Sequence, residues 1–158
     1  MKERIKLAKK PKVVAVSGGF DPIHIGHVRM FEEAKKLGDK LVVILNNDNW
    51  LRKKKQCIFM GQNERSAIIG ALKPVDRVVL TKHKNNDSDV SVCQALKELK
   101  PDIFANGGDR KPSGDPVPEV DVCKKLGIKM VYNIGRGGKM QSSSWLLEKY
   151  VKNINKKN

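Results

Sequence analysis

Short apolar runs alternate with stretches of helical periodicity along most of the chain. Strands are predicted where consecutive aliphatic and β-branched residues leave no polar face, at 13–17, 40–46, 77–81, 102–105 and 128–132. Helices are predicted where apolar residues recur every three or four positions, at 26–37, 62–72, 88–99, 119–126 and onward from 142–144. Between the second strand and the second helix, the basic run 52–55 is expected to be a flexible loop.

Strands that are apolar on both faces and alternate with helices are typical of a parallel sheet covered on both sides. The predicted fold class is therefore α/β, a Rossmann-like three-layer sandwich with a five-stranded parallel sheet and right-handed crossovers. In such a sheet the ligand site lies beyond the carboxyl ends of the strands. The loops that follow the predicted strands are 17–27, 46–62, 81–88, 106–118 and 133–144.

The length of 158 residues and the mass of 17.7 kDa predict one domain, 1–158, with basic tails at 1–11 and 153–158. The formal charge of +15 is concentrated at the ends: residues 1–12 hold six basic residues against one acidic residue, and 149–158 hold four and none. Nucleic acid is an unlikely partner, because 5% aromatic residues provide few surfaces on which bases could stack.

The apolar runs are much shorter than a membrane span, and the first residues lack the apolar core of a signal peptide. We therefore expect a cytoplasmic protein without a membrane partner. The three cysteines Cys57, Cys93 and Cys123 are widely spaced and form no C-x-x-C pair. This pattern argues against a disulfide framework and against a structural zinc site, and it favours buried free thiols.

The loop after the first strand contains the most informative motif, Gly18-Gly-Phe-Asp-Pro-Ile-His-Ile-Gly-His27. Gly18 and Gly19 let backbone amides approach a ligand, and Gly26 leaves room for a phosphate at a helix N-terminus. His24 and His27 lie three residues apart and can face one pocket. Imidazoles placed in this way suit transfer at a nucleotide α-phosphate, where they stabilise charge that develops on oxygen. On spacing alone, a satisfied surface pair or a weak metal site remains equally open.

This motif resembles the F-D and H-x-G-H signature of the cytidylyltransferase-like nucleotidyltransferases. The similarity continues through Glu64-Arg65, Gly107-Gly-Asp109 and Ser142-Ser-Ser144, in the family's order. Within the family, the chain looks most like the heptose 1-phosphate adenylyltransferases and next most like the glycerol-3-phosphate cytidylyltransferases. The resemblance implies a Rossmann-like enzyme that joins a nucleoside triphosphate to a phosphate ester and releases pyrophosphate.

The resemblance also implies roles for individual residues. His24 and His27 would contact the triphosphate and stabilise the transition state, with Gly18, Gly19, Phe20, Asp21 and Gly26 around the nucleotide. Asp21 could equally form a turn before Pro22. In the basic run, one of Lys53, Lys54 and Lys55 is expected to enter the site, with Lys55 as the catalytic candidate and Lys53 and Lys54 as substrate-binding ones. Arg65 would lie close to the acceptor phosphate; the alternative is an ion pair on a helix surface.

Further nucleotide contacts are implied at Gly107, Gly108 and Asp109, and at the hydroxyls of Ser142, Ser143 and Ser144. Adenylyl-transferring relatives favour lysine before the Gly-Gly-Asp box, where this chain has Asn106. Arg136 is similar to the arginine of the cytidylyl enzymes' R-T-E-G motif, which favours CTP, whereas the Gly-Gly-Asp box favours ATP. No residue is assigned as a metal ligand, and Mg²⁺ would accompany the triphosphate as cofactor.

The sequence therefore predicts an enzyme that transfers an adenylyl group to a heptose-type sugar phosphate. A cytidylyltransferase acting on glycerol 3-phosphate or another polyol phosphate is the alternative. A different class is a basic module without catalysis that binds nucleotide or nucleic acid, because a fold alone does not establish an activity. The family resemblance also favours a homodimer, with Phe59, Met60, Trp145 and Tyr150 as apolar candidates for its surface.

Overall fold

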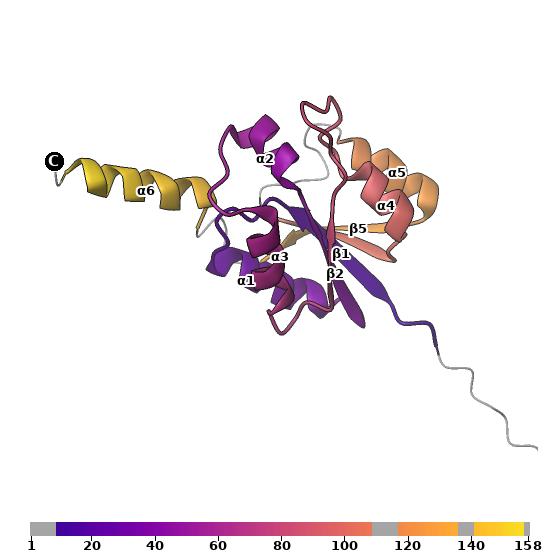
Figure 1. Cartoon of the computed structure of the whole chain (residues 1–158). Helices are drawn as coiled ribbons and strands as arrows, with labels where there is room; N and C mark the ends of the chain where they lie inside the picture. Colours follow the sequence, from indigo (N-terminus) through magenta and orange to yellow (C-terminus); the bar gives the residue numbers. More distant parts are fainter. Residues whose placement is uncertain (1–8, 109–116, 136–140, 157–158) are drawn as a thin grey trace, which may run out of the picture.

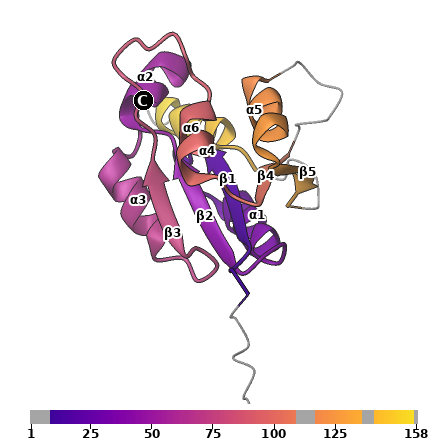
Figure 2. The ribbon, with the colours of Figure 1, turned by 90° about the vertical axis from the view of Figure 1, so that its right-hand side faces the viewer.

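The computed structural model describes residues 9–108, 117–135 and 141–156. It contains a five-stranded parallel sheet in the order β3-β2-β1-β4-β5, and Figure 2 shows the strands side by side in this order. The strands are β1 (Val13–Gly18), β2 (Lys40–Leu45), β3 (Arg77–Leu80), β4 (Ile103–Gly107) and β5 (Lys129–Ile134). The helices are α1 (Ile25–Lys35), α2 (Asp48–Lys55), α3 (Gln62–Gly70), α4 (Cys93–Leu99), α5 (Pro118–Leu126) and α6 (Ser143–Asn155). The predicted fold class is confirmed.

Two apolar clusters cover the two faces of the sheet. On one face, Phe31 of α1 and Ile69 of α3 pack against Val14, Val16 and Leu45. On the other face, the side chains of α4 and α5 pack against the sheet residues Ala15, Ile44 and Phe104. Alternation along each strand divides its residues between the two clusters, so the sheet is the middle of three layers.

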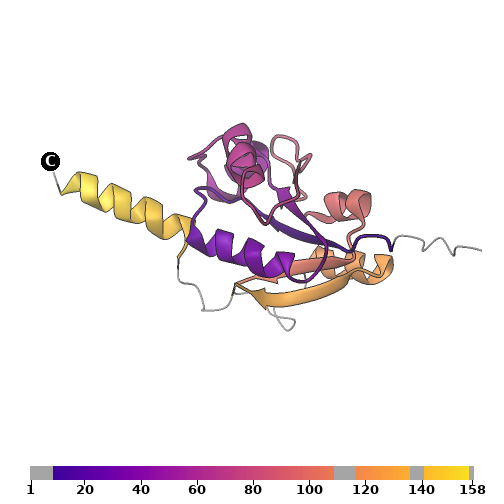
Figure 3. The same cartoon turned by 90° about the horizontal axis from the view of Figure 1, so that it is seen from below.

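Helix α6 differs from the others because it extends away from the three layers, as Figures 1 and 3 show. From Glu148 to its end at Asn155, every residue of this helix is exposed. The helix thus includes the first residues of the segment 153–158 that the sequence analysis assigned to a tail. Among the helices that the structure describes, none has the length and apolar composition that a membrane span requires.

The prediction of a flexible loop at 52–55 is wrong, because these residues form the last turn of α2. Asn47 begins the helix by accepting a hydrogen bond from the Trp50 amide, and Gln56 ends it in the left-handed conformation. A cluster of cations is favourable at this end, where the helix dipole is negative. A run of lysines therefore marks the end of a helix here.

Helix α4 begins at Cys93, five residues later than predicted. The preceding residues form turns, because the carboxylates of Asp87 and Asp89 accept hydrogen bonds from nearby backbone amides, including those of Lys84 and Ser91. Cys93 and Cys123 are buried thiols, as expected, whereas Cys57 is exposed, so the prediction for that cysteine is wrong.

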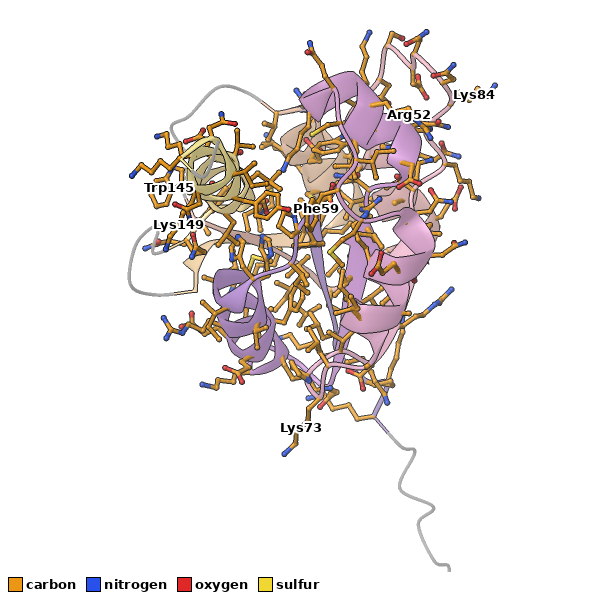
Figure 4. The ribbon with its side chains drawn as sticks, turned by 60° about the vertical axis from the view of Figure 1, so that its left-hand side comes forward. Arg52, Phe59, Lys73, Lys84, Trp145 and Lys149 are labelled. Carbon is orange, nitrogen blue, oxygen red and sulfur yellow. The ribbon has the colours of Figure 1, made fainter. Side chains whose placement is uncertain are left out.

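Positive charge is distributed over several sides of the molecule. Lys73, Lys84 and Lys149 point outward in three different directions in Figure 4. A face that binds nucleic acid would gather such cations on one side. Their placement gives no support to the nucleic-acid-binding alternative.

Candidate active site

A cavity of about 440 Å³ lies at the carboxyl ends of β1 and β4, beside the N-termini of α1 and α6. This is the edge at which the sequence analysis placed the ligand. Twelve of the predicted site residues line the cavity: Gly18, Gly19, Phe20, His24, Gly26, His27, Lys55, Gly107, Gly108, Ser142, Ser143 and Ser144. Residues at or after the ends of β1, β4 and β5 and one residue of α2 are therefore brought together at one place.

The two histidines form the N-terminal cap of α1. His24 Nδ1 accepts a hydrogen bond from the Gly26 amide at 3.1 Å, and His27 Nδ1 accepts one from the His24 amide at 3.3 Å. The two rings stack with their centroids 3.6 Å apart. An imidazole whose Nδ1 accepts a hydrogen bond carries its proton on Nε2 when it is neutral. Each ring consequently keeps one Nε2–H donor for a ligand in the cavity.

The surroundings favour the neutral form of both rings. Burial, together with the neighbouring charges of His24 and Lys55, lowers the pKa of His27 to about 3. The pKa of His24 is also lowered, first by burial and then by Lys55. Lys55 acts on both rings, so its ammonium group supplies positive charge near a pair of neutral donors. This arrangement suits an anionic ligand with several oxygens.

The three serines at the start of α6 have different surroundings. Ser142 is the N-cap, and its Oγ accepts a hydrogen bond from the Trp145 amide at 3.4 Å. The Ser143 hydroxyl donates to the Pro22 carbonyl oxygen at 2.8 Å and so joins α6 to the loop after β1. Ser144 is exposed at the cavity. The N-terminus of α6 therefore faces the same space as the histidines, and both helix ends favour phosphate there.

Glycine leaves room for neighbouring side chains at two positions of the cavity wall. A Cβ on Gly107 would lie 2.5 Å from the sulfur of Met30, and one on Gly18 would lie 2.7 Å from the ring of Phe20. Phe20 makes edge contacts with the rings of His27 and Phe31. The ring of Phe20 thus packs against the ring of His27, and the two glycines leave room for Phe20 and for Met30 of α1.

Asp21 lines no part of the cavity. Its carboxylate is buried and accepts hydrogen bonds from the backbone amides of Phe59 at 2.8 Å and Met60 at 2.7 Å. It therefore holds the loop between α2 and α3 against the loop after β1. The expected contacts of Asp21 with nucleotide are corrected to this positioning role.

The predicted place of Arg65 beside the acceptor phosphate is also corrected. Its side chain is completely buried in α3 and does not line the cavity. The guanidinium donates to the carbonyl oxygens of Gly19, Asn46 and Met60 at 2.7–2.9 Å and to the Asp48 carboxylate at 2.7 Å. Arg65 joins the loops after β1 and β2 to α2 and α3, so it is a positioning residue.

The remaining predicted site residues are two lysines of α2 and two residues outside the described parts of the chain. Lys53 and Lys54 are exposed on α2 and do not line the cavity, which leaves Lys55 as the lysine of this run that enters the site. Asp109 and Arg136 lie outside the residues that the structure describes.

Eight cavity residues were not predicted as part of the site: Ser17, Arg29, Met30, Trp50, Asn106, Ile134, Gly135 and Gln141. Trp50 was missed because its helix was read as a loop, and Met30 because an apolar residue on α1 is indistinguishable from a core residue. Asn106 was noticed only as the residue that replaces a lysine. The position of Ser17 and Asn106 at the ends of strands was the signal that could have identified them.

Mg²⁺ prefers carboxylate oxygens and water as ligands. The cavity-lining residues given above include no aspartate or glutamate, and both oxygens of Asp21 are engaged by backbone amides. Over the described parts of the chain, no group of three or more His, Cys, Asp or Glu side chains could hold a metal. These residues do not fit a protein-held Mg²⁺ ion.

A family model described as cytidylyltransferase-like matches residues 15–125, a range that contains the glycines and both histidines of the loop after β1. The chain belongs to the cytidylyltransferase-like family. It is accordingly a nucleotidyltransferase, and the basic module without catalysis is not supported.

Several family members resemble the chain over much of its length. An FAD synthase of Thermoplasma volcanium is 35% identical over 143 residues, which are 89% of this chain and 95% of that protein. An FAD synthase of Aciduliprofundum boonei is 37% identical over 117 residues, 74% of this chain and 73% of that protein. The bifunctional protein HldE of Gluconobacter oxydans is 40% identical over 122 residues, 76% of this chain but 24% of that protein.

A crystal structure described as the lipopolysaccharide core biosynthesis protein from Thermoplasma volcanium has the same fold. Its TM-score is 0.62 with 32% identity, over 78% of this chain and 97% of that one. The predicted membership of the superfamily is thus confirmed. The predicted closeness to heptose enzymes is supported only in part, because most of these cytidylyltransferase-like relatives are FAD synthases.

Proposed function

We propose that the protein transfers the adenylyl group of ATP to a phosphate monoester and releases pyrophosphate. The observation that carries the proposal is the pair of stacked imidazoles at the N-terminus of α1, each with Nδ1 engaged and Nε2 left for the cavity. Lys55 and the start of α6 add positive potential on two further sides of the same space. These groups suit a triphosphate better than a neutral ligand.

In the proposed reaction, an oxygen of the acceptor phosphate attacks the α-phosphorus of ATP. The new O–P bond forms as the bond from the α-phosphorus to the bridging oxygen breaks, and pyrophosphate leaves with the electron pair. An ionised phosphate oxygen needs no general base, so no side chain has to remove a proton. The Nε2–H groups of His24 and His27 donate to the α-phosphate oxygens, where they stabilise the charge of the transition state. Lys55 reduces the repulsion between the two anionic reactants.

The relatives favour ATP as the nucleotide. An FAD synthase forms FAD by adenylyl transfer to FMN, and two of these enzymes match the chain over 73–95% of their own length. FMN is therefore one candidate acceptor. A heptose-type sugar phosphate is the other, because a quarter of the HldE protein matches this chain at 40% identity. Transfer from CTP to glycerol 3-phosphate has less support and serves as a comparison in the test.

Pyrophosphate release measured with each of the four nucleoside triphosphates tests the proposal directly. Each nucleotide is combined with FMN, a heptose 1-phosphate and glycerol 3-phosphate, and the His27→Ala variant serves as the inactive control. We expect release with ATP and at least one acceptor, and much slower release with the variant. Faster turnover with CTP would overturn the choice of nucleotide. No release with any pair would overturn the proposed reaction.

A further inference from the structure

A row of polar residues follows the buried cluster on the α4 and α5 face of the sheet. The apolar members of that cluster include Ala15 of β1, Ile44 of β2 and Phe104 of β4. Residues two positions apart on a strand point to the same face. Two positions after these three residues, the sequence has Ser17, Asn46 and Asn106. Where β1 pairs with β4, Ala15 is level with Phe104, so Ser17 stands beside Asn106 at the ends of these strands. Where β1 pairs with β2, Ser17 is level with Ile44, so Asn46 lies two residues beyond that pair.

Two members of this row have buried polar atoms without a hydrogen-bond partner in the described parts of the chain. These atoms are Oδ1 of Asn46 and Nδ2 of Asn106. The two residues are only 4% and 5% exposed. A buried amide atom without a partner is costly, and nearly all such atoms in native proteins are satisfied. Within the described parts of the chain these are the two buried side-chain atoms without a partner, so each is open to a bound molecule.

Asn106 and Ser17 also line the cavity, so a bound molecule can supply that partner. Trp50 lines the same cavity, and its indole Nε1 donates to the Val90 carbonyl oxygen at 2.8 Å. This bond fixes the ring against the 81–92 segment. The apolar face of a fixed indole packs well against the C–H groups of a carbohydrate or against a flat ring.

This row lies away from the groups that suit the triphosphate. The histidines, Phe20 and the serines of α6 belong to the α1 side of the cavity, where Phe20 packs on Phe31. The Ser17 and Asn106 positions belong to the opposite face. Lys55, on the same helix as Trp50, is close enough to both histidines to lower the pKa of each. An acceptor could therefore place its phosphate near Lys55 and the remainder of its chain along Ser17 and Asn106.

On the basis of the proposed function, we infer that Ser17 and Asn106 form the acceptor subsite and bind hydroxyl groups carried next to the acceptor's phosphate. A hydroxyl both donates and accepts, so it can satisfy an amide donor and a serine hydroxyl together. The acceptor is then a phosphorylated polyhydroxy chain. Both a sugar phosphate and the ribityl phosphate part of FMN have this chemistry, so the experiment includes an arm for each.

The test compares glycerol 3-phosphate with n-propyl phosphate, which has the same three-carbon chain without hydroxyls. With saturating ATP, we expect the wild type to use the hydroxylated ester at least tenfold better in kcat/KM, as a site built to bind hydroxyls does. Asn106→Leu keeps a similar shape without the amide, and Ser17→Ala removes the hydroxyl. Each of the two substitutions should lower the ratio of kcat/KM for glycerol 3-phosphate to kcat/KM for n-propyl phosphate by about fivefold, which is the effect of one hydrogen bond. The KM for ATP should not change. The matched control is Asn153→Ala, at an exposed asparagine of α6.

FMN and a hexose 1-phosphate are then measured with the same variants. If the variants lose more kcat/KM with one of these two substrates, that substrate is the kind of acceptor that the subsite prefers. Equal use of the two three-carbon esters by the wild type would overturn the inference. So would equal losses for both esters in Asn106→Leu and Ser17→Ala, because a purely structural role predicts that result.

Binding without turnover separates this inference from the proposed reaction. The chain has two tryptophans, so Trp145→Phe leaves Trp50 as the single tryptophan reporter at the cavity. Quenching of its fluorescence by glycerol 3-phosphate at lower concentration than by propyl phosphate supports the subsite, even if no pyrophosphate is released. Such binding without transfer would overturn the proposed reaction and keep the subsite. Transfer activity without this preference in binding or in kcat/KM would overturn the subsite and keep the reaction.

Discussion

The cavity has a phosphate end, formed by the N-termini of α1 and α6, and a second end, formed by Ser17 and Asn106. The two ends differ in how many of their polar groups already have a hydrogen-bond partner in the described parts of the chain. At the α1 end, both Nδ1 atoms and two of the three serine hydroxyls take part in hydrogen bonds. At the end formed by Ser17 and Asn106, amide atoms of Asn46 and Asn106 have no partner among the described residues. The phosphate end is thus rigid before any ligand binds, whereas the other end depends on one. Enzymes that perform the same transfer on different acceptors would be expected to differ in their residues at this second end.

The largest expected effect is that of removing Arg65, which hydrogen-bonds to both ends through the carbonyl oxygens of Gly19 and Asn46. Arg65→Ala leaves these oxygens and the Asp48 carboxylate without their donor. We predict a loss of about 3–5 kcal/mol in the free energy of unfolding, the usual cost of breaking a buried ion pair. Urea unfolding measures it. Arg77→Ala, at an exposed arginine of β3, is the control and should change stability by less than about 0.5 kcal/mol. Equal stability of the two variants would show that Arg65 is not needed to join the ends.

The next effect is confined to the phosphate end. His27→Ala removes an Nε2–H donor, and we predict that turnover falls by about a hundredfold or more while affinity for ATP changes little. The variant also loses the capping hydrogen bond to the His24 amide, at a cost of about 1 kcal/mol. His27→Gln is the matched variant, since glutamine at this position can restore the cap. Equal losses in turnover and in ATP affinity would contradict a role specific to the transition state.

The pH dependence of stability separates the two ends further, because His24 and His27 belong to the phosphate end alone. Burial, His24 and Lys55 lower the pKa of His27 to about 3 in the folded protein, against 6.5 in the unfolded chain. Between these values the unfolded chain binds a proton that the folded protein does not, so the free energy of unfolding decreases as the pH falls below 6.5. We predict about 1–2 kcal/mol of extra loss at pH 4 relative to His27→Gln, after allowance for solvent screening at a partly exposed ring. Parallel stability curves for the two proteins would contradict this.

The sequence predicted the phosphate end far better than the other. Its glycines and histidines lie within ten consecutive residues, and the strands were predictable because they are apolar on both faces. Arg65 and Asp21 were placed in contact with ligand, because a charged residue in a motif carries no sign of whether it is buried. Asn106 and Ser17 meet only when strands far apart in the sequence pair, so no local pattern indicated them. The helical state of 52–55 depended on the Asn47 cap.

Helix α6 begins in the phosphate end and extends beyond the rest of the protein, which favours a second chain as its partner. Tyr150, Val151 and Ile154 lie within about 100° of one another around this helix and are 42–61% exposed, whereas the exposed Trp145 lies on the opposite side. Exposed apolar residues at this spacing form a stripe that would be covered in an assembly. We predict a homodimer, seen in sedimentation equilibrium as a species of twice 17.7 kDa, and dissociation in Val151→Glu. A species of 17.7 kDa for the wild type at micromolar concentration would contradict the dimer.

The smallest expected effect comes from the basic ends of the chain, whose described residues do not line the cavity. Residues 153–156 are exposed, and neither they nor residues 9–12 line the cavity. We predict that removing 1–9 and 153–158 changes adenylyl transfer by less than about twofold, because no cavity group is lost. The same pyrophosphate assay measures this at low ionic strength, where the attraction of the tails for anionic substrates would be largest. If the shortened protein stays folded but loses most of its activity, the tails have to supply charge to the site.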